Sequence, residues 1–226
     1  MNKKSVLVII SVIILAFFIG MSEKAKTQDD VKTNRGLRPL NLDVVYPQID
    51  EILIQHAADS AIANVMRNYQ SILDSGVRHG GPINAIRITQ GVFPAILKAH
   101  SQNGWTIDFA SDKNRNNNLR AETDEKIVLE YFADSTTILP DKGEWLGSGD
   151  NLKYRFYKPL WVEKSCLSCH GKPEDLPPQM TEELDKLYPE DKAIGLKAND
   201  LYGIFVVEIE WPKGKKFAFV LAENNK

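Results

Sequence analysis

Residues 47–74 read PQIDEILIQHAADSAIANVMRNYQSILD. Apolar side chains recur in this stretch at intervals of three and four residues, among them Ile54, Ala58, Ile62, Val65 and Tyr69. Because an α-helix has about 3.6 residues per turn, this spacing places them on one side of a helix. The stretch is therefore predicted to be one long amphipathic helix whose apolar stripe packs against the rest of the fold.

A break follows this helix. Residues 75–82 contain three glycines and Pro82, which interrupt helical structure, and the apolar spacing resumes from Ile86 to His100. Two helices joined by so short a break turn back on each other. We expect an N-terminal helical hairpin.

The rest of the chain has a different pattern. β-Branched and aromatic residues are concentrated in four stretches, 105–110, 154–162, 203–211 and 216–223, several of which alternate with polar residues. They are predicted to be strands of an antiparallel sheet, with the last two joined by a turn at 212–215. Residues 122–134 have the spacing of a short helix. The expected fold class is α+β, with the helical hairpin first and the sheet after it.

The first 45 residues differ from the remainder. Two lysines near Met1 precede an apolar run that ends at Gly20, and small residues follow at a position where a signal peptidase cuts. The run is at the short end for a membrane span. We expect residues 1–22 to be a signal peptide or, if uncleaved, a membrane anchor. Residues 23–45 are expected to be a polar tether and residues 46–226 the folded domain, in the periplasm or an equivalent exported compartment.

Composition excludes one class of partner. The formal net charge is -2, so the chain offers no basic field for a nucleic-acid backbone. Hydrophobic residues make up 43% and charged residues 26%, as in ordinary globular domains. Nucleic acid is therefore not an expected partner.

Both cysteines of the chain lie in residues 165–171, SCLSCHG. In a Cys-x-x-Cys-His motif the two thiols add to the two vinyl groups of a haem, and the histidine that follows binds its iron. Covalent attachment keeps an exported protein from losing its haem. The motif predicts one haem c, attached through Cys166 and Cys169, with His170 as the proximal iron ligand.

Two other interpretations compete with haem, a thioredoxin-like dithiol and half of a zinc site. A redox dithiol opens a helix in a βαβ unit, whereas the polar residues 171–175 follow here at once. Zinc needs a fourth ligand, which His56, His79 or His100 would have to supply from far away in sequence. Haem remains the prediction.

Four blocks of sequence extend the argument: YKPL at 157–160, CLSCHG at 166–171, YPEDKAIG at 188–195 and GIFVV at 203–207. In this order they resemble the single-haem c-type cytochrome domain family with a PAS-like fold, long catalogued as a domain of unknown function. The resemblance covers most of residues 46–210. It implies a PAS-like antiparallel sheet flanked by helices, with haem c in the cleft between the layers, in domains that carry electrons or precede sensor modules.

The distal iron ligand does not follow from that resemblance. Where many relatives carry a cysteine, this chain has Thr89, a weak iron ligand. If the hairpin turns near His79, then Tyr69 and Thr89, ten residues on either side of it, lie side by side. Tyr69 is thus the distal candidate, with a tyrosine packed in the helix interface as the alternative and Met66 as the next candidate.

Several other residues have a structural interpretation as well as a functional one. His100 lies about 16 Å along the helix from Thr89, so we expect it to be packed or helix-terminal, and His56 and His79 to be surface or loop residues. Four cations are candidates to pair with haem propionates if they are not merely solvated: Arg115, Arg120, Lys153 and Arg155. Four tryptophans are expected in the core rather than as electron relays: Trp105, Trp145, Trp161 and Trp211.

The expected function is that of a monohaem c-type cytochrome, which transfers electrons to or from a redox partner protein. The alternative is a haem-based redox or gas sensor that binds NO, CO or O2 and acts through a partner. A haem peroxidase is a third possibility. Membrane contact is expected only through the N-terminal segment if that segment is not cleaved.

Overall fold

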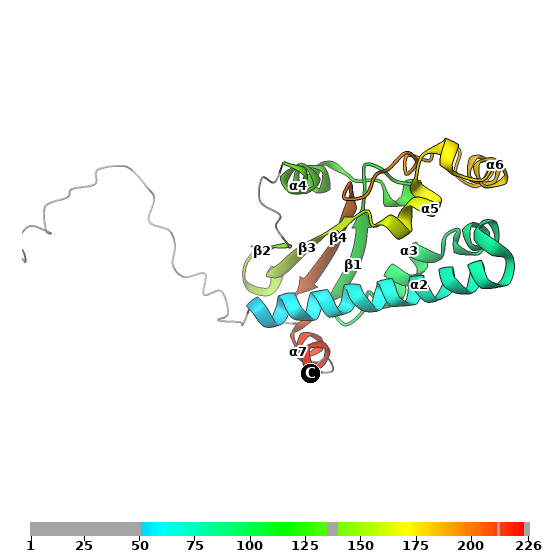
Figure 1. Ribbon diagram of the computed structural model, residues 1–226. Coiled ribbons are helices and arrows are strands. Elements are labelled where there is room, and N and C mark those ends of the chain that lie inside the picture. Colours follow the sequence, from blue (N-terminus) through cyan, green and yellow to red (C-terminus); the bar gives the residue numbers. More distant parts are fainter. Residues whose placement is uncertain (1–50, 135–139, 212, 224–226) are drawn as a thin grey trace, which may run out of the picture. The chain divides into compact units, whose positions relative to one another are not determined.

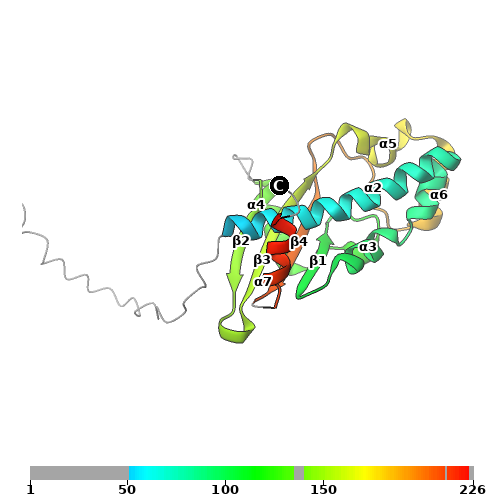
Figure 2. The same ribbon diagram turned by 90° about the horizontal axis from the view of Figure 1, so that it is seen from below.

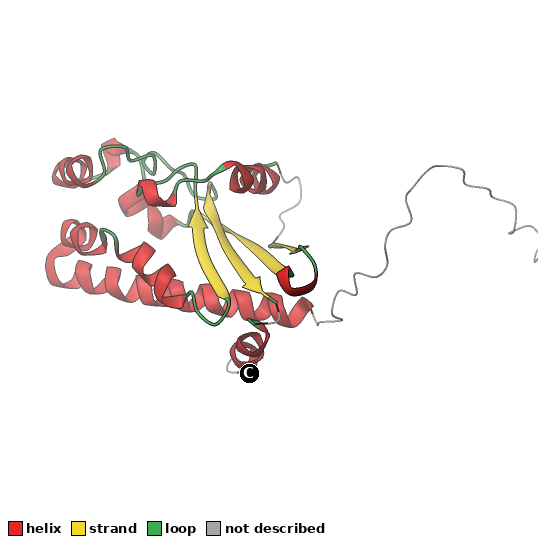
Figure 3. Cartoon of the chain, turned by 180° about the vertical axis from the view of Figure 1, so that it is seen from behind, coloured by secondary structure: helices red, strands yellow, loops and turns green. Residues whose placement is uncertain are grey.

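The computed structural model describes residues 51–134, 140–211 and 213–223 (Figure 1). The expected signal peptide or anchor and the polar tether lie outside the described residues. Helices and strands follow one another as α2 Glu51–Thr89, α3 Val92–His100, β1 Trp105–Ala110, α4 Thr123–Ala133, β2 Lys142–Leu146, β3 Lys153–Trp161, α5 Leu167–His170, α6 Pro178–Leu187, β4 Leu201–Glu210 and α7 Lys215–Glu223. The expected α+β class and the short helix predicted at 122–134 are confirmed (Figure 3).

The N-terminal hairpin is present. Its first arm is the predicted long helix, which continues beyond Asp74 as far as the bend at Gly80 and Gly81. Gly81 has a φ of 73°, a backbone conformation that glycine adopts without steric cost. The second arm is interrupted at Gly91, which also has a positive φ, and so consists of the end of α2 and the separate helix α3. Figure 1 shows the two arms side by side.

The four strands form one antiparallel sheet in the order β1-β4-β3-β2. The strands predicted at 105–110, 154–162 and 203–211 are confirmed as β1, β3 and β4. Strand β2 was not predicted, because its sequence KGEWL has neither clear alternation nor β-branched residues. The more specific comparison with PAS-like domains stays a prediction.

The prediction of a strand at 216–223 is wrong, because this segment is helix α7. Strand β4 is already paired with β1 on one side and β3 on the other, so no edge is free for a hairpin with the segment that follows. Phe217 and Ala218 instead join the core that α2 forms with the sheet, and α7 packs against α2 (Figure 2). The indole of Trp105 donates a hydrogen bond to the Gly214 carbonyl just before α7 (2.9 Å).

Helices cover both faces of the sheet. Because neighbouring side chains of a strand point to opposite faces, Phe205 of β4 packs toward α2 while Ile204 packs toward α4. The α2 side is the larger core, and its buried members include Ile54, Ala58, Val65, Ile107, Phe156 and Val207. Among the described residues, no helix is long and apolar enough to cross a membrane.

Candidate functional site

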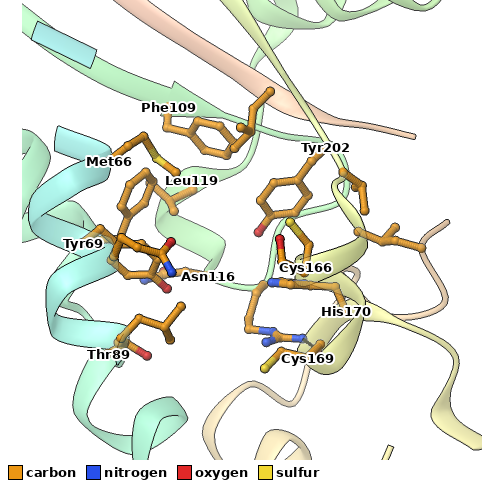
Figure 4. A pocket seen from close by; sticks show the side chains of 18 of the residues that line it. Met66, Tyr69, Thr89, Phe109, Asn116, Leu119, Cys166, Cys169, His170 and Tyr202 are labelled. Atoms are coloured by element: carbon orange, nitrogen blue, oxygen red, sulfur yellow. Dashed lines mark hydrogen bonds between the residues drawn. The ribbon is translucent and has the colours of Figure 1, made fainter. Parts of the chain in front are cut away.

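A cavity of about 350 Å³ lies between the helical hairpin and the loop that carries the two cysteines. Cofactor sites typically measure about 300–1,000 Å³ and have mainly apolar linings with a few polar groups. In Figure 4, three residues from the cysteine loop stand on one side of this cavity, and we call them the motif wall: Cys166, Cys169 and His170. Three residues of α2 stand on the other side, and we call them the helix wall: Met66, Tyr69 and Thr89.

The motif wall is built by a single helical turn. A short 3-10 turn at Lys164–Cys166 leads directly into α5, Leu167–His170. Side chains three and four positions apart lie on the same side of such a turn, so both cysteines and the histidine reach the same cavity. Both thiols are free and partly exposed. The local sequence thus brings together the three residues that the motif predicted.

His170 is held in one tautomer. Its Nδ1 atom lies 2.8 Å from the backbone carbonyl of Ala193. A carbonyl only accepts hydrogen bonds, so Nδ1 carries the hydrogen and donates it. Burial, together with the nearby positive charge of Arg115, lowers the pKa of His170 to about 3, although the Ala193 contact opposes this. The neutral ring therefore keeps a lone pair on Nε2, as metal-binding histidines do.

The helix wall confirms the geometry expected of the hairpin. Tyr69 and Thr89 line the same cavity, and the Thr89 hydroxyl lies close enough to Tyr69 to affect its pKa. Burial raises the pKa of Tyr69 above that of an ordinary phenol, which Thr89 and the charge of Arg115 only partly offset. The Tyr69 ring also packs edge-on against Phe93, with centroids 5.0 Å apart. Tyr69 is thus a neutral phenol at the cavity wall.

Among the four candidate cations, Arg115 lines the cavity. Its guanidinium bonds to Asp191 and to the Cys169 carbonyl, and its side chain is 13% exposed. Lys153 and Arg155 instead pair with Glu208 on the neighbouring strand β4. These two, like the exposed Arg120, are not among the residues that line the cavity.

The remaining histidines take the ordinary roles expected of them. His100 lies 3.1 Å from the side-chain amide nitrogen of Asn68 on the other arm of the hairpin and does not line the cavity. His56 and His79 are exposed on α2. Of the tryptophans, Trp161 lines the cavity, whereas Trp105 and Trp211 are buried in the core.

Reasoning from residue chemistry missed several groups at the site. Tyr188 and Tyr202 contribute further phenols to the cavity. Asp191 and Ala193 lie behind the motif wall and hold Arg115 and His170. The signal for three of these residues was the block at 188–195, which carries the family resemblance but no chemical motif.

The donor set fits the haem c that the motif predicts. Two thiols and a neutral imidazole with a free Nε2 line the same cavity, which Arg115, paired with Asp191, also lines. Aromatic side chains, including Phe93 and Phe109, provide apolar surface for a porphyrin ring. Within residues 51–134, 140–211 and 213–223, no group of three or more His, Cys, Asp or Glu side chains is placed to hold a metal ion.

Comparison with known protein families shows which family the chain belongs to. The model of the Tll0287-like family matches residues 46–210. The chain belongs to this family. This Tll0287-like domain is also similar to one solved structure, the crystal structure of the cyanobacterial heme-protein Tll0287, at 20% sequence identity and a TM-score of 0.45. The similarity covers 69% of this chain and 94% of that one. No curated protein matches the chain.

Proposed function

We propose that this chain is a monohaem c-type cytochrome that transfers electrons in the periplasm or an equivalent exported compartment. The observation that carries the proposal is the motif wall, where Cys166, Cys169 and His170 line one cavity and the His170 ring presents an unprotonated Nε2. The cleavable or anchoring N-terminal segment, which the sequence predicts, supplies the route of export. The partner is a redox protein of the same compartment.

Each residue of the motif wall has a defined part. The thiols of Cys166 and Cys169 would each add S–H across one vinyl group, which would form a C–S and a C–H bond and release nothing. His170 would bind the iron through Nε2. When bound, haem supplies a one-electron Fe(III)/Fe(II) couple.

On the helix wall, Tyr69 is the distal candidate and Met66 the next. Tyr69 reaches the cavity beside Thr89, and phenolate is a known ligand of ferric haem iron. Its raised pKa favours the neutral phenol, so ligation requires that the proton leave. A phenolate would stabilise the ferric state and lower the potential, whereas a methionine would raise it.

Two of the three side chains of the helix wall favour one alternative, a redox or gas sensor. A phenol and a hydroxyl do not compete strongly for ferrous iron, so NO, CO or O2 could occupy the distal position if Met66 does not bind the iron. A sensor would pass this binding on to a partner protein.

One pair of measurements separates the two functions. Stopped-flow mixing of the ferric protein with reduced c-type cytochromes of the same compartment should give rapid haem reduction. Addition of CO to the ferrous protein should leave its affinity for those partners unchanged. Haem reduction far slower than the turnover of the electron-transfer chain to which those cytochromes belong would rule out the electron-carrier function. CO binding that changes the affinity for a partner protein would identify a sensor.

A further inference from the structure

Three loops meet behind the motif wall: residues 111–116 after β1, the motif loop around Cys169, and residues 188–196 before β4. We propose that the Arg115–Asp191 ion pair is a positioning pair that fixes the orientation and donor strength of the His170 imidazole. The inference rests on the proposed function, in which His170 is the proximal ligand. It concerns residues that do not themselves bind iron.

The pair reaches His170 through a continuous set of hydrogen bonds. Arg115 Nε donates to Asp191 Oδ2 at 2.8 Å, and Asp191 Oδ1 accepts from the Ala193 backbone N–H at 2.7 Å. The carbonyl of the same Ala193 accepts from His170 Nδ1 at 2.8 Å. One carboxylate therefore has both oxygens committed, one to the cation and one to the residue that orients the imidazole.

Arg115 also fixes the other end of the motif wall. Its Nη2 atom donates to the Cys169 carbonyl at 2.7 Å, one residue before His170. The planar guanidinium thus holds Cys169 and Asp191 at a fixed separation, which a lysine ammonium could not reproduce with the same geometry. The histidine is held from both sides, through its own backbone and through its ring.

The burial of the pair supports a positioning role. The side chains of Arg115 and Asp191 are only 13% and 8% exposed, whereas those of Arg155 and Glu208 in the sheet are 28% and 20% exposed. Buried ion pairs often add little net stability, because desolvation offsets their attraction. The main effect of burying these two charges beside the site is therefore to fix the orientation of the groups that they contact.

The loop does not depend on the pair alone. The backbone N–H groups of Gly195 and Leu196 donate to the carbonyls of Gly171 and His170 at 2.8 and 2.9 Å. Lys192 N–H donates to the Asn114 carbonyl at 3.0 Å. These bonds remain when the ion pair is removed, so variants of the pair should keep the fold while the imidazole gains freedom.

The test uses the full chain, purified with its haem from a host that matures c-type cytochromes. Asp191→Asn keeps an acceptor for the Ala193 N–H but loses the charged contact with Arg115. Arg115→Lys keeps the positive charge but loses the planar guanidinium that contacts Asp191 and Cys169 together. The matched controls are Glu208→Gln and Arg155→Lys in the sheet. The readouts are the electron paramagnetic resonance spectrum of the ferric protein and its midpoint potential.

Both site variants should keep covalent haem, show a broadened or split ferric signal, and shift the midpoint potential upward. The upward shift follows because a weaker bond at Nδ1 makes the imidazole a poorer donor and so stabilises ferric iron less. The controls should match the wild type in both readouts.

Two results would overturn the inference. One is wild-type spectra and potentials in both site variants. The other is failure of both site variants to fold while the controls fold, which would assign the pair to stability alone. A wild-type chain without covalent haem would instead overturn the proposed function.

Discussion

The motif wall is held by hydrogen bonds among three loops, whereas the helix wall is held by the packing of two helical arms. His170 has its Nδ1 committed to Ala193, while Tyr69 rests between Thr89 and the ring of Phe93. The motif wall offers an imidazole in one fixed orientation, whereas the helix wall offers a phenol and a thioether as alternative ligands. We therefore propose that the motif wall determines whether haem is held and that the helix wall tunes its potential.

The largest contrast is expected from the two ligand candidates on opposite walls. His170→Ala should leave haem tethered through the cysteines but change both the ferric and the ferrous absorption spectra, because the proximal nitrogen is lost. Met66→Leu, a change of similar volume on the helix wall, should leave both spectra as they are. Altered spectra in Met66→Leu would move the distal assignment from Tyr69 to Met66.

A smaller change should follow from removing the Tyr69 hydroxyl. Tyr69→Phe keeps the ring packed on Phe93, and it should alter the ferric spectrum and raise the midpoint potential, because phenolate stabilises ferric iron. Tyr188→Phe, which removes another phenol from the cavity lining, is the matched control. An unchanged spectrum and potential in Tyr69→Phe would exclude Tyr69 from the iron.

Each wall is followed closely in the chain by a glycine whose replacement should affect stability for a different reason: Gly171 comes directly after His170, and Gly91 comes two residues after Thr89. A Cβ at Gly171 would lie 2.5 Å from the Leu167 carbonyl oxygen, so Gly171→Ala should cost about 2 kcal/mol through overpacking. Gly91 has open space around it but a φ of 74°, so Gly91→Ala should cost about 1 kcal/mol. Urea unfolding of both variants checks the order, and a larger loss in Gly91→Ala would contradict it.

The smallest effect concerns pH and the attachment of α2 to α6 near the helix wall. Arg87, two residues before Thr89, makes a bidentate ion pair with Glu183, and this contact lowers the pKa of Glu183. A lowered pKa in the folded state stabilises the fold above the unfolded value of about 4.3, and this contribution is lost as pH falls through the folded value.

Urea unfolding between pH 7 and pH 3 tests this attachment. Glu183→Gln should lose part of the acid-dependent fall in stability, whereas Glu182→Gln, an exposed neighbour on α6, should retain it. Identical pH profiles for Glu183→Gln and the wild type would contradict the assignment.

The two walls also differ in how far the sequence predicts them. The three residues of the motif wall lie within five positions, so a local pattern is sufficient. Tyr69 and Thr89 were paired correctly because a helix advances by a regular rise per residue. Residues at equal distances from the turn of a hairpin therefore lie opposite each other. The helical spacing of α2 and the composition of three strands were equally local signals.

The remainder depends on contacts between distant segments. The strand expected at 216–223 is a helix because β4 has neighbours on both edges, which its own sequence does not reveal. Asp191 and Ala193 lie more than 20 positions from His170 in the chain, and their bonds arise only when three loops meet. Arg115 was separated from the other cations only by its place in the folded cavity.

The central claim is that haem is covalently bound through the motif wall, and intact mass tests it most directly. The full chain would be expressed in a host that matures c-type cytochromes, denatured, and weighed beside the Cys166→Ala/Cys169→Ala double variant. We expect the wild type to keep the added mass of one haem after denaturation and the double variant to lose it. Wild-type protein at the mass of the polypeptide alone would contradict the account.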